Sequence, residues 1–358
     1  MTLRSIPRGR QRLVFAFVVV LSLYSVTPAD PRRAERNAPI TAGTYDAPVA
    51  AVSRPRASIW ENPADVSARN LYYGPGGKEH APHTTFTFDK EDLKGSNPKF
   101  DVRDENGTKW KVKLGSEARP EVAASRFVWA VGYYANEDYF LTNLHVEQMP
   151  HLKRGNRLVH DGTVHDVRLK RYEKFEKKIA DWEWKDNPFS HHRELNGLRV
   201  MMALLNNWDL KDVNNAIYQE KPKDGDSLEL HYLVSDLGAS FGTAGRSIGE
   251  GASKGNLKSY RHSKFITKVT PEYVDFNVPA RPNAVFFVTS TGEYVSRTHM
   301  RWIGKHIPRS DAKWIAGYLA QLTPQQIRDA FRAAGYSPDQ VEGFASVVEK
   351  RIAELRAL

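Results

Sequence analysis

The alternation of apolar and polar residues predicts that the first half of the folded region is rich in strands. Short runs of β-branched and aromatic residues lie at 84–88, 99–104 and 108–115. Between the last two, the triplet "ENG" at 105–107 predicts a tight hairpin turn. The runs "DYFLTNLHV" and "TVHDVRLKRY" predict two further strands. We therefore expect an antiparallel sheet.

One helix is predicted between two of these strands along the chain. The stretch "RPEVAASRFVWAVGYY" follows the third strand, and Pro120 suits the first turn of a helix. Apolar residues then share one face at helical spacing, namely Ala123, Phe127, Ala130, Val131 and Tyr134. The pattern thus predicts a helix inserted after the third strand.

The second half has a more helical pattern. Leu195, Leu198, Met201, Met202 and Leu205 repeat at intervals of three and four, which predicts a helix running directly into the polar stretch 206–218. Nearer the end, "TPQQ" and "SPDQ" each provide an N-cap, a Pro at the first helical position and a Gln at the third. Gly335 stands where a C-terminal cap belongs. We expect two helices at about 324–334 and 338–356.

The N-terminus has the pattern of an export signal. Four arginines precede an apolar run at 13–26, which is shorter than the roughly 20 residues of a membrane span. Ala29 is a plausible cleavage position, so residues 1–29 are expected to be a signal peptide, although an uncleaved anchor stays open. Residues 30–58 are rich in Pro, Ala and Arg without periodicity and are expected to form a flexible linker.

Composition narrows the possible functions. The 358 residues include no cysteine, which excludes disulfides, thiolate nucleophiles and cysteine-ligated zinc. The net charge is +10, or +6 without the four arginines of the export segment, and the charges are scattered. No basic stripe or known motif suggests a nucleic-acid partner. A mild preference for anionic ligands such as nucleotides fits this charge.

Two polar stretches carry the candidate chemistry, "NNWDLKDVNNAIY" and "YLVSDLGASFG". The segments 215–219 and 228–235 are both predicted to be strands. Paired as a hairpin, they would return Asp236 to the neighbourhood of Asn214 and Asp209. A carboxylate and an amide oxygen suit magnesium, which typically takes one or two carboxylates with water and phosphate. Asp209 could accept a proton from an attacking hydroxyl, and Lys211 could balance phosphate charge.

These residues also resemble protein kinases. "DLKDVN" is similar to the D-L-K-x-x-N catalytic loop, and "DLG" to the D-F-G metal motif. The resemblance implies that Asp209 is the catalytic base, that Lys211 contacts phosphate, and that Asn214 and Asp236 bind Mg²⁺. ATP or another nucleotide would be the cofactor.

The first half continues the resemblance. Lys113 in "KVKLG" resembles the strand lysine that holds nucleotide phosphates, and Glu121 resembles its ion-pair partner, with Glu117 as a competing acid. The surrounding stretch resembles HipA-like, phosphatidylinositol-kinase-like and secretory-pathway kinases. The implied fold is α+β and two-lobed, with a β-rich N-lobe at 59–185 and a helical C-lobe at 186–358.

The sequence departs from the kinase pattern in three places. Asn207 and Trp208 replace the His-Arg of the catalytic loop, and no A-P-E motif follows the "DLG". No G-x-G-x-x-G stands before the third strand, so covering the phosphates falls to Gly95 and Ser96. The glycine-rich stretch 242–256 is expected to be a flexible loop.

The resulting hypothesis is an exported, periplasmic or extracellular kinase-like phosphotransferase. Its acceptor hydroxyl is undefined and could belong to a protein, a sugar, a lipid head group or a metabolite. A membrane is a partner only if the N-terminal segment stays uncleaved.

Two alternatives stay open. A non-catalytic pseudokinase would explain the missing glycine motif and the scarcity of ATP outside the cytoplasm. A secreted metal- or glycan-binding protein would depend on the histidines or the aromatic cluster at 182–189, with the histidines being His145, His151, His160 and His165.

Overall fold

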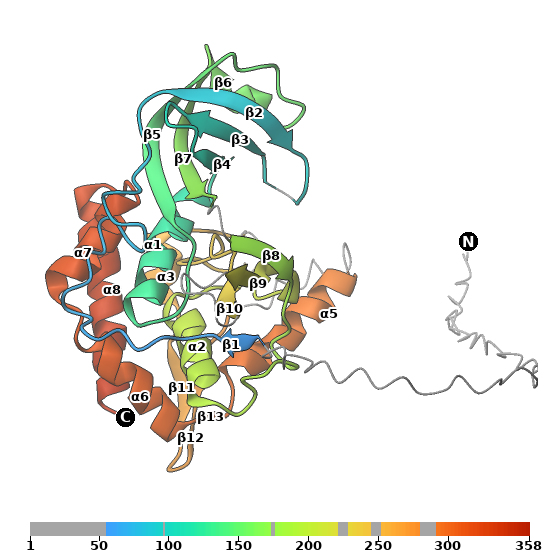
Figure 1. Cartoon of the computed structure of the whole chain (residues 1–358). Coiled ribbons are helices and arrows are strands. Elements are labelled where there is room, and N and C mark those ends of the chain that lie inside the picture. The colour runs from blue at the N-terminus through green and yellow to red at the C-terminus, as the bar shows by residue number, and fades with distance from the viewer. Residues whose placement is uncertain (1–54, 96, 173–175, 221–227, 245–251, 280–290) are drawn as a thin grey trace, which may run out of the picture. The chain divides into compact units, whose positions relative to one another are not determined.

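The computed structural model describes residues 55–358, except 96, 173–175, 221–227, 245–251 and 280–290 (Figure 1). The predicted signal peptide and almost all of the predicted linker lie outside these residues. Within the described part, no helix is both long enough and apolar enough to cross a bilayer.

The strands predicted in the first half are confirmed, and they close into a ring (Figure 1). They are β2 (Phe86–Asp92), β3 (Lys99–Asp104), β4 (Lys109–Lys113), β5 (Asp138–Glu147) and β7 (Thr163–Arg171). The short strand β6 (Val159–His160), which was not predicted, pairs with β7 beside the ring. Their order is β4-β3-β2-β5-β7-β6, and β4 also pairs with β7. Closure leaves fewer unpaired strand edges.

The sheet differs from the prediction in one pairing, because β2 and β5 run parallel where an antiparallel sheet was expected. Phe86 lies opposite Val146 in this short pair. The difference follows from α1, which separates β4 from β5 along the chain. A crossover of that length allows β5 to return beside β2 in the same direction, which a tight hairpin cannot do.

Alternation along the strands separates two kinds of side chain. Phe100 and Val112 lie opposite each other and belong to a hydrophobic cluster enclosed by the ring, together with Trp110. The intervening positions carry charges, and Lys99 is the register partner of Lys113. Successive side chains of a strand point to opposite faces. The pattern that fills the core therefore also puts the candidate phosphate lysine on the outside of the ring.

The inserted helix is α1 (Ala118–Ala130), and it begins at the predicted place. Its burial differs from the expectation of one apolar face, because nearly every side of it is covered. The helix contacts β5 and β7 on one side and α7 (Pro324–Ala333) on another. Small residues such as Ala123 and Ala124 permit this close packing.

A second sheet contains strands from distant parts of the chain, in the order β1-β10-β9-β8. The strands are β1 (Arg56–Ser58), β8 (Glu176–Ala180), β9 (Asn215–Glu220) and β10 (Glu229–Val234). Two of these pairings were not predicted. Residues 56–58, predicted as linker, pair with β10, and β8 pairs with β9 although its residues were predicted to belong to the first lobe.

The remaining elements are mostly helical, and all but one lie in the second half, which was predicted to be the more helical one. They are α2 (Arg193–Leu204), η1 (Asn156–Leu158), η2 (Asp212–Asn214), α3 (Leu257–His262), β11 (Ile266–Val269), β12 (Tyr273–Phe276), α5 (Thr291–His299), η3 (Met300–Gly304), β13 (Ile307–Pro308), α6 (Arg309–Leu319) and α8 (Pro338–Arg356). The predicted capping boxes are present at Thr323 with Gln326 and at Ser337 with Gln340.

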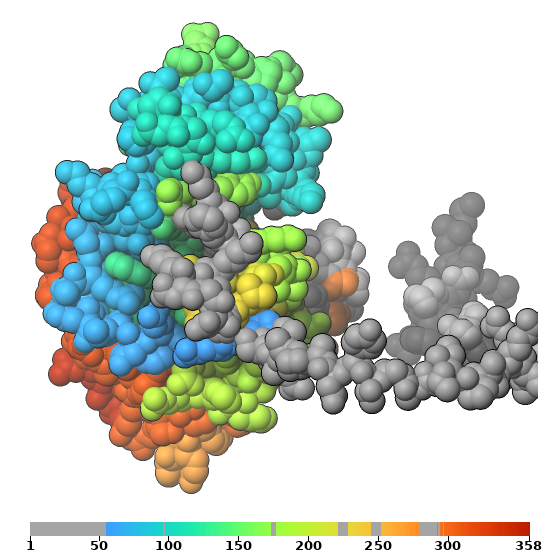
Figure 2. All heavy atoms as spheres, viewed as in Figure 1, coloured from blue at the N-terminus to red at the C-terminus, as the bar shows by residue number. Residues whose placement is uncertain are grey.

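The fold is therefore mixed α and β, as expected. In the space-filling view, the strands of the ring, coloured from light blue to green, gather together, and the orange and red C-terminal helices gather apart from them (Figure 2). The ring encloses one hydrophobic cluster, and α1, α2 and the C-terminal helices share another. The division into two lobes at residue 185 stays a prediction.

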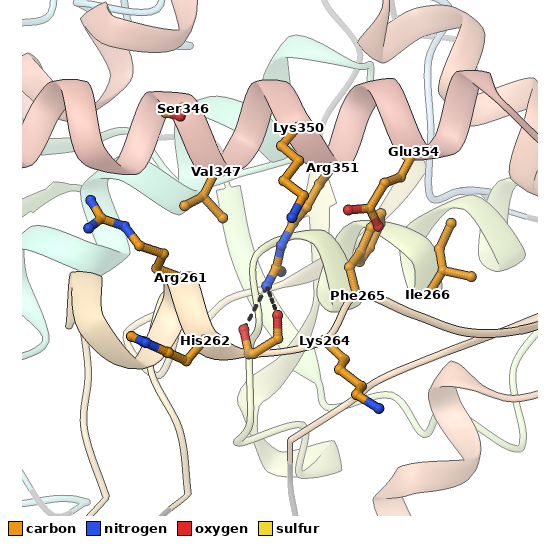
Figure 3. A pocket seen from close by; sticks show the side chains of 11 residues that line it. Arg261, His262, Lys264, Phe265, Ile266, Ser346, Val347, Lys350, Arg351 and Glu354 are labelled. Carbon is orange, nitrogen blue, oxygen red and sulfur yellow. Dashed lines mark hydrogen bonds between the residues drawn. The ribbon is translucent and has the colours of Figure 1, made fainter.

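A buried arginine holds the end of α2, from which the candidate loop starts. The Arg351 guanidinium donates to the carbonyl oxygens of Ala203 and Leu204 at 3.1 and 2.8 Å, and to Ser263 Oγ at 2.6 Å. Arg351 also lines a cavity of about 460 Å³ between α8 and the segment that follows α3 (Figure 3). A cation is favourable at the negative C-terminal ends of helices α2 and α3, so the Arg351 guanidinium stabilises the packing of these helix ends.

Candidate active site

The hairpin predicted from the sequence is confirmed. Strands β9 and β10 pair antiparallel, with Asn215 opposite Val234. The hairpin brings the "DLG" segment back to the loop that precedes β9, where the backbone N–H of Asp236 donates to the Asn214 carbonyl at 3.1 Å. The turn itself, residues 221–227, lies outside the described residues. Local strand pairing thus brings two of the predicted metal ligands together.

The loop between α2 and β9 is held by its own amide side chains. Asn214 Nδ2 donates to the carbonyl oxygen of Asp209 at 2.7 Å, and the backbone N–H of Asp209 donates to Asn207 Oδ1 at 3.1 Å. Asn206 adopts a positive φ of 55° and donates to the Gly242 carbonyl. These bonds fix the position of Asp209 relative to Asn214.

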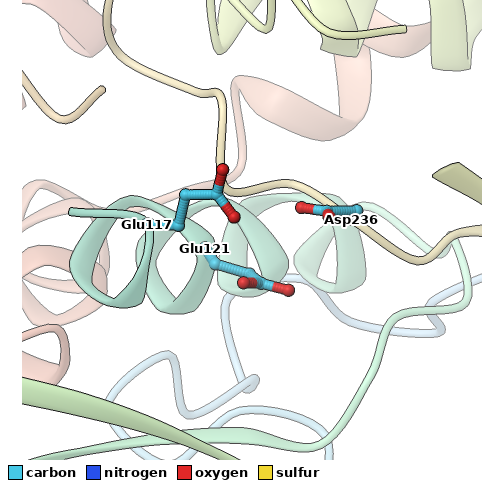
Figure 4. A group of neighbouring side chains, drawn as sticks. All are labelled: Glu117, Glu121 and Asp236. Carbon is cyan, nitrogen blue, oxygen red and sulfur yellow. The ribbon is translucent and has the colours of Figure 1, made fainter. Parts of the chain in front are cut away.

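Lys113 lies at the centre of three carboxylates. Its Nζ is 2.7 Å from Glu121 Oε2, 3.1 Å from Glu117 Oε2 and 3.2 Å from Asp236 Oδ1. Glu117 and Glu121 stand one turn apart on α1, and Asp236 comes from the loop after β10 (Figure 4). The structure therefore brings together Lys113, Glu121 and Asp236, and it adds Glu117, which the sequence left as a competitor.

The charges at this centre depend on burial and on one another. Burial disfavours the ammonium, but Glu121 and Asp236 raise the pKa of Lys113 above its ordinary value. Burial raises the pKa of Glu121, against the effect of Arg168 and Lys113. The pKa of Asp236 is lowered, because Lys113 and the Gly238 N–H outweigh its burial. Lys113 is thus held in its charged form.

Sequence reasoning missed a second layer of ion pairs. Arg168 Nη2 lies 2.9 Å from Glu121 Oε1, and Arg168 Nε lies 3.5 Å from Asp138 Oδ1. Lys254, from the glycine-rich stretch after the "DLG", pairs with Glu117. Arg168 is the register partner of Lys113 on β7, so the only available signal was the alternation of β7.

The candidate base has its own cationic partner. Arg297 Nη1 on α5 lies 3.1 Å from Asp209 Oδ1, and Lys211 Nζ lies 3.9 Å from the same oxygen. The Arg297 guanidinium also lies over the Trp208 ring, 4.8 Å from its centroid. Trp208, which replaces the arginine of the kinase pattern, therefore supports a cation beside Asp209. The sequence contained no signal for Arg297.

The residues assigned to covering phosphates are only partly described. Gly95 has a φ of +71°, a conformation that favours glycine, and its carbonyl accepts from Arg154 Nη1 at 2.8 Å. Ser96 lies outside the described residues. Gly95 nevertheless belongs to the loop between β2 and β3, and β3 pairs directly with the strand that carries Lys113.

The other predicted chemistry finds less support. Among the described residues, Glu117, Glu121 and Asp236 are the acidic or histidine side chains that converge as a possible metal group, and Lys113 Nζ already lies beside all three. His160 and His165 line a cavity of about 350 Å³ but are not part of a converging group. In the aromatic cluster, Trp182 and Trp184 are buried in the main core.

One pH effect follows from the outer face of the ring. Burial by itself raises the pKa of Asp92. The hydrogen bond from Lys111 and the nearby charge of Lys99 lower this pKa by more, so its net value falls below the ordinary one. A lowered pKa stabilises the fold above the unfolded-state value near 4 and loses that contribution as the pH falls. Between pH 5 and pH 3, we expect the free energy of unfolding of Asp92→Asn to fall by less than that of the wild type, as measured by urea unfolding. An equal loss in the variant and the wild type would contradict this assignment.

No protein-family model and no curated protein matches the sequence. The chain is similar to the Helicobacter pylori proinflammatory kinase CtkA, at 10% identity and a TM-score of 0.41, over 77% of this chain and 98% of that one. It is also similar to a Chaetomium thermophilum Rio2 kinase solved as an ADP/Mg²⁺-phosphoaspartate complex, at 10% identity and a TM-score of 0.29, over 75% and 72%. Both of these solved proteins are kinases.

Proposed function

We propose that this protein is an atypical kinase-like phosphotransferase that uses a magnesium-bound nucleotide such as ATP. The observation that carries the proposal is the ion pair of Lys113 with both Glu121 and Asp236. These residues come from a strand, a helix and a loop far apart in the sequence. Convergence of a buried cation and a metal-type carboxylate is an arrangement that phosphoryl transfer requires.

The donor groups fit magnesium and phosphate. The Asp236 side chain is 39% exposed, so its carboxylate stays accessible while Oδ1 accepts from Lys113. Asn214 Nδ2 is engaged with the Asp209 carbonyl, which directs the amide oxygen of Asn214 away from it. When bound, magnesium would neutralise phosphate charge at these oxygens. Lys113 would hold the phosphates of the nucleotide.

The remaining residues act on the acceptor. Asp209 would orient the attacking hydroxyl and accept its proton, because it lies in the same hydrogen-bonded loop as Asn214. Lys211 and Arg297 would balance the charge that accumulates during transfer. We also propose that the acceptor is a hydroxyl group and that the chain is exported to the periplasm or the extracellular space.

We expect Asp209→Asn to separate binding from transfer. The variant keeps the backbone bonds of the loop but loses the proton acceptor, so transfer or hydrolysis of labelled γ-phosphate should fall about 10²-fold or more. Nucleotide with Mg²⁺ should still raise the melting temperature of the variant as it raises that of the wild-type chain. The measurement pairs a thermal shift with a labelled-phosphate assay. A wild-type chain that binds no nucleotide at millimolar concentration would overturn the proposed function.

A pseudokinase is the second candidate, and one observation favours it. Arg297 engages Asp209 directly, so the candidate base is already paired in this structure. A binding module would show the magnesium-dependent thermal shift with no phosphate release above the level of Asp209→Asn. The same two assays therefore distinguish the candidates.

A further inference from the structure

The outside of the ring next to Lys113 has a second lysine that the kinase resemblance does not assign. Lys99 starts β3 and is the register partner of Lys113, so both side chains lie on the same face. Its ammonium lies under the loop between β2 and β3, 3.3 Å from where a Cβ on Gly95 would stand. Lys99 thus occupies the place between the phosphate lysine and the loop that should cover phosphates.

Lys99 has little counter-charge of its own. Its nearest described carboxylate oxygen is Asp92 Oδ2 at 3.9 Å, beyond hydrogen-bond distance, and its side chain is only 20% exposed. Burial lowers the pKa of Lys99, as do the nearby charges of Lys111 and Lys113, and the charges of Asp92 and Asp236 offset this only in part. A half-buried ammonium with a distant partner gains strongly from an incoming anion.

The part of this face next to Lys113 is lined by charged side chains. A nucleobase would be better suited by an apolar slot. Lys111 precedes Lys113 by two residues on β4 and pairs with Asp92 and, at 3.6 Å, with Asp101 Oδ1. Tyr172 covers these groups, with its ring centroid 5.7 Å from Lys111 Nζ and its hydroxyl 3.2 Å from Asp101 Oδ1. An aromatic ring stacks on any base, since every base has a π-face. Among the described neighbours, these polar groups are engaged with one another, so they provide little that would distinguish one base from another.

We infer that the donor site recognises its ligand mainly through a chain of phosphates, held by Lys99 together with Lys113, and selects weakly among bases. This inference rests on the proposed function and names the ligand class of the same site. It also accounts for the missing glycine-rich motif, because a side-chain ammonium at Lys99 supplies the cationic contact that backbone N–H groups of such a loop would otherwise give.

The test compares ligands that share phosphates but differ in the base. Binding of ATP, GTP, CTP and inorganic tripolyphosphate to the full chain would be measured with Mg²⁺ by calorimetry and thermal shift. We expect the four dissociation constants to agree within about fivefold, since the shared phosphates supply most of the binding. Adenosine should produce no shift.

A matched pair of variants then tests Lys99 itself. Lys99→Met should weaken all four ligands about tenfold or more, the loss expected for one charge-assisted contact. The control is Lys109→Met, which removes the same charge from the same face of β4. Lys109 is 24% exposed and pairs with Asp89 at 3.0 Å and with Asp101 at 3.2 Å, and it lies four residues, or about 13 Å, from Lys113. This control should bind like the wild type.

Each outcome decides a different point. Binding of ATP at least about thirtyfold tighter than GTP and tripolyphosphate, or unchanged binding by Lys99→Met, would overturn the inference and leave the proposed function standing. A wild-type chain that binds none of the four ligands would overturn the proposed function and the inference with it. Loss of binding in both lysine variants would contradict a specific role for Lys99.

Discussion

Replacing Asp236 with asparagine is expected to abolish magnesium-dependent nucleotide binding while the fold is retained. Asparagine keeps an oxygen that accepts from the Gly238 N–H, as Asp236 Oδ1 does at 3.1 Å, so the local backbone should stay in place. The variant loses the negative charge that would hold Mg²⁺. Phosphate transfer should fall by about 10²-fold or more, the usual effect of removing a charge-stabilising group from such a site.

The measurement is the melting temperature of the full chain with and without ATP and Mg²⁺. A ligand that binds only the native state stabilises it by about 2.7 kcal/mol at a hundredfold excess over its dissociation constant, and this gain should disappear in the variant. Asp166→Asn is the control. Asp166 on β7 pairs with Arg119 on α1 at 2.9 Å and has no contact with Lys113 in the described structure. A full magnesium-dependent shift in Asp236→Asn would place the metal elsewhere.

Replacing Lys113 with methionine should cause the largest loss of stability among these variants. The change leaves Glu121 and Glu117, both buried, without the ammonium that lies 2.7 and 3.1 Å from them. Removing one partner of a buried ion pair typically costs about 3–5 kcal/mol, because the other charge stays buried and uncompensated. Arg168 still contacts Glu121 at 2.9 Å, so we expect about 3 kcal/mol rather than the upper value.

Urea unfolding at pH 7 would measure this effect, with Lys178→Met as the control for an exposed lysine, because Lys178 pairs with the equally exposed Asp181 at 2.6 Å. The control should lose no more than about 1 kcal/mol. The double variant Lys113→Met with Glu121→Gln completes a double-mutant cycle. The two substitutions together should cost less than the sum of their separate costs, because the Lys113–Glu121 pair is then lost only once. Equal stabilities of Lys113→Met and the wild type would show that the carboxylates are not ionised as the geometry implies.

The candidate site is held by two kinds of interaction that respond differently to mutation. Asp209, Asn214 and Asp236 are joined by short-range backbone and amide bonds, within one loop and the hairpin that follows it. Lys113 and Glu121 depend on the packing of α1 against the ring of strands. We therefore expect changes on α1 to disturb phosphate binding without changing the loop that contains Asp209.

The local parts of this structure were predictable from short stretches of the sequence. Period-two runs located β3 at 99–104 as observed, and the two capping boxes located the starts of α7 and α8. The return of Asp236 to Asn214 was also predictable, because a hairpin joins neighbouring segments and its geometry is set by its two strands. The order Lys113, Glu121, Asp209, Asn214 and Asp236 indicated kinase-like chemistry for the same reason, since each residue stands in a motif only a few residues long.

Only the tertiary structure decided which distant groups share the site. Arg168, Lys254 and Arg297 each come from elements far along the chain from the carboxylate they contact, and no short motif marks them. The pairing of residues 56–58 with β10 and the closure of β4 on β7 are of the same kind. Such contacts depend on how whole elements pack and on the burial that this packing produces, and neither is encoded in a single stretch of sequence.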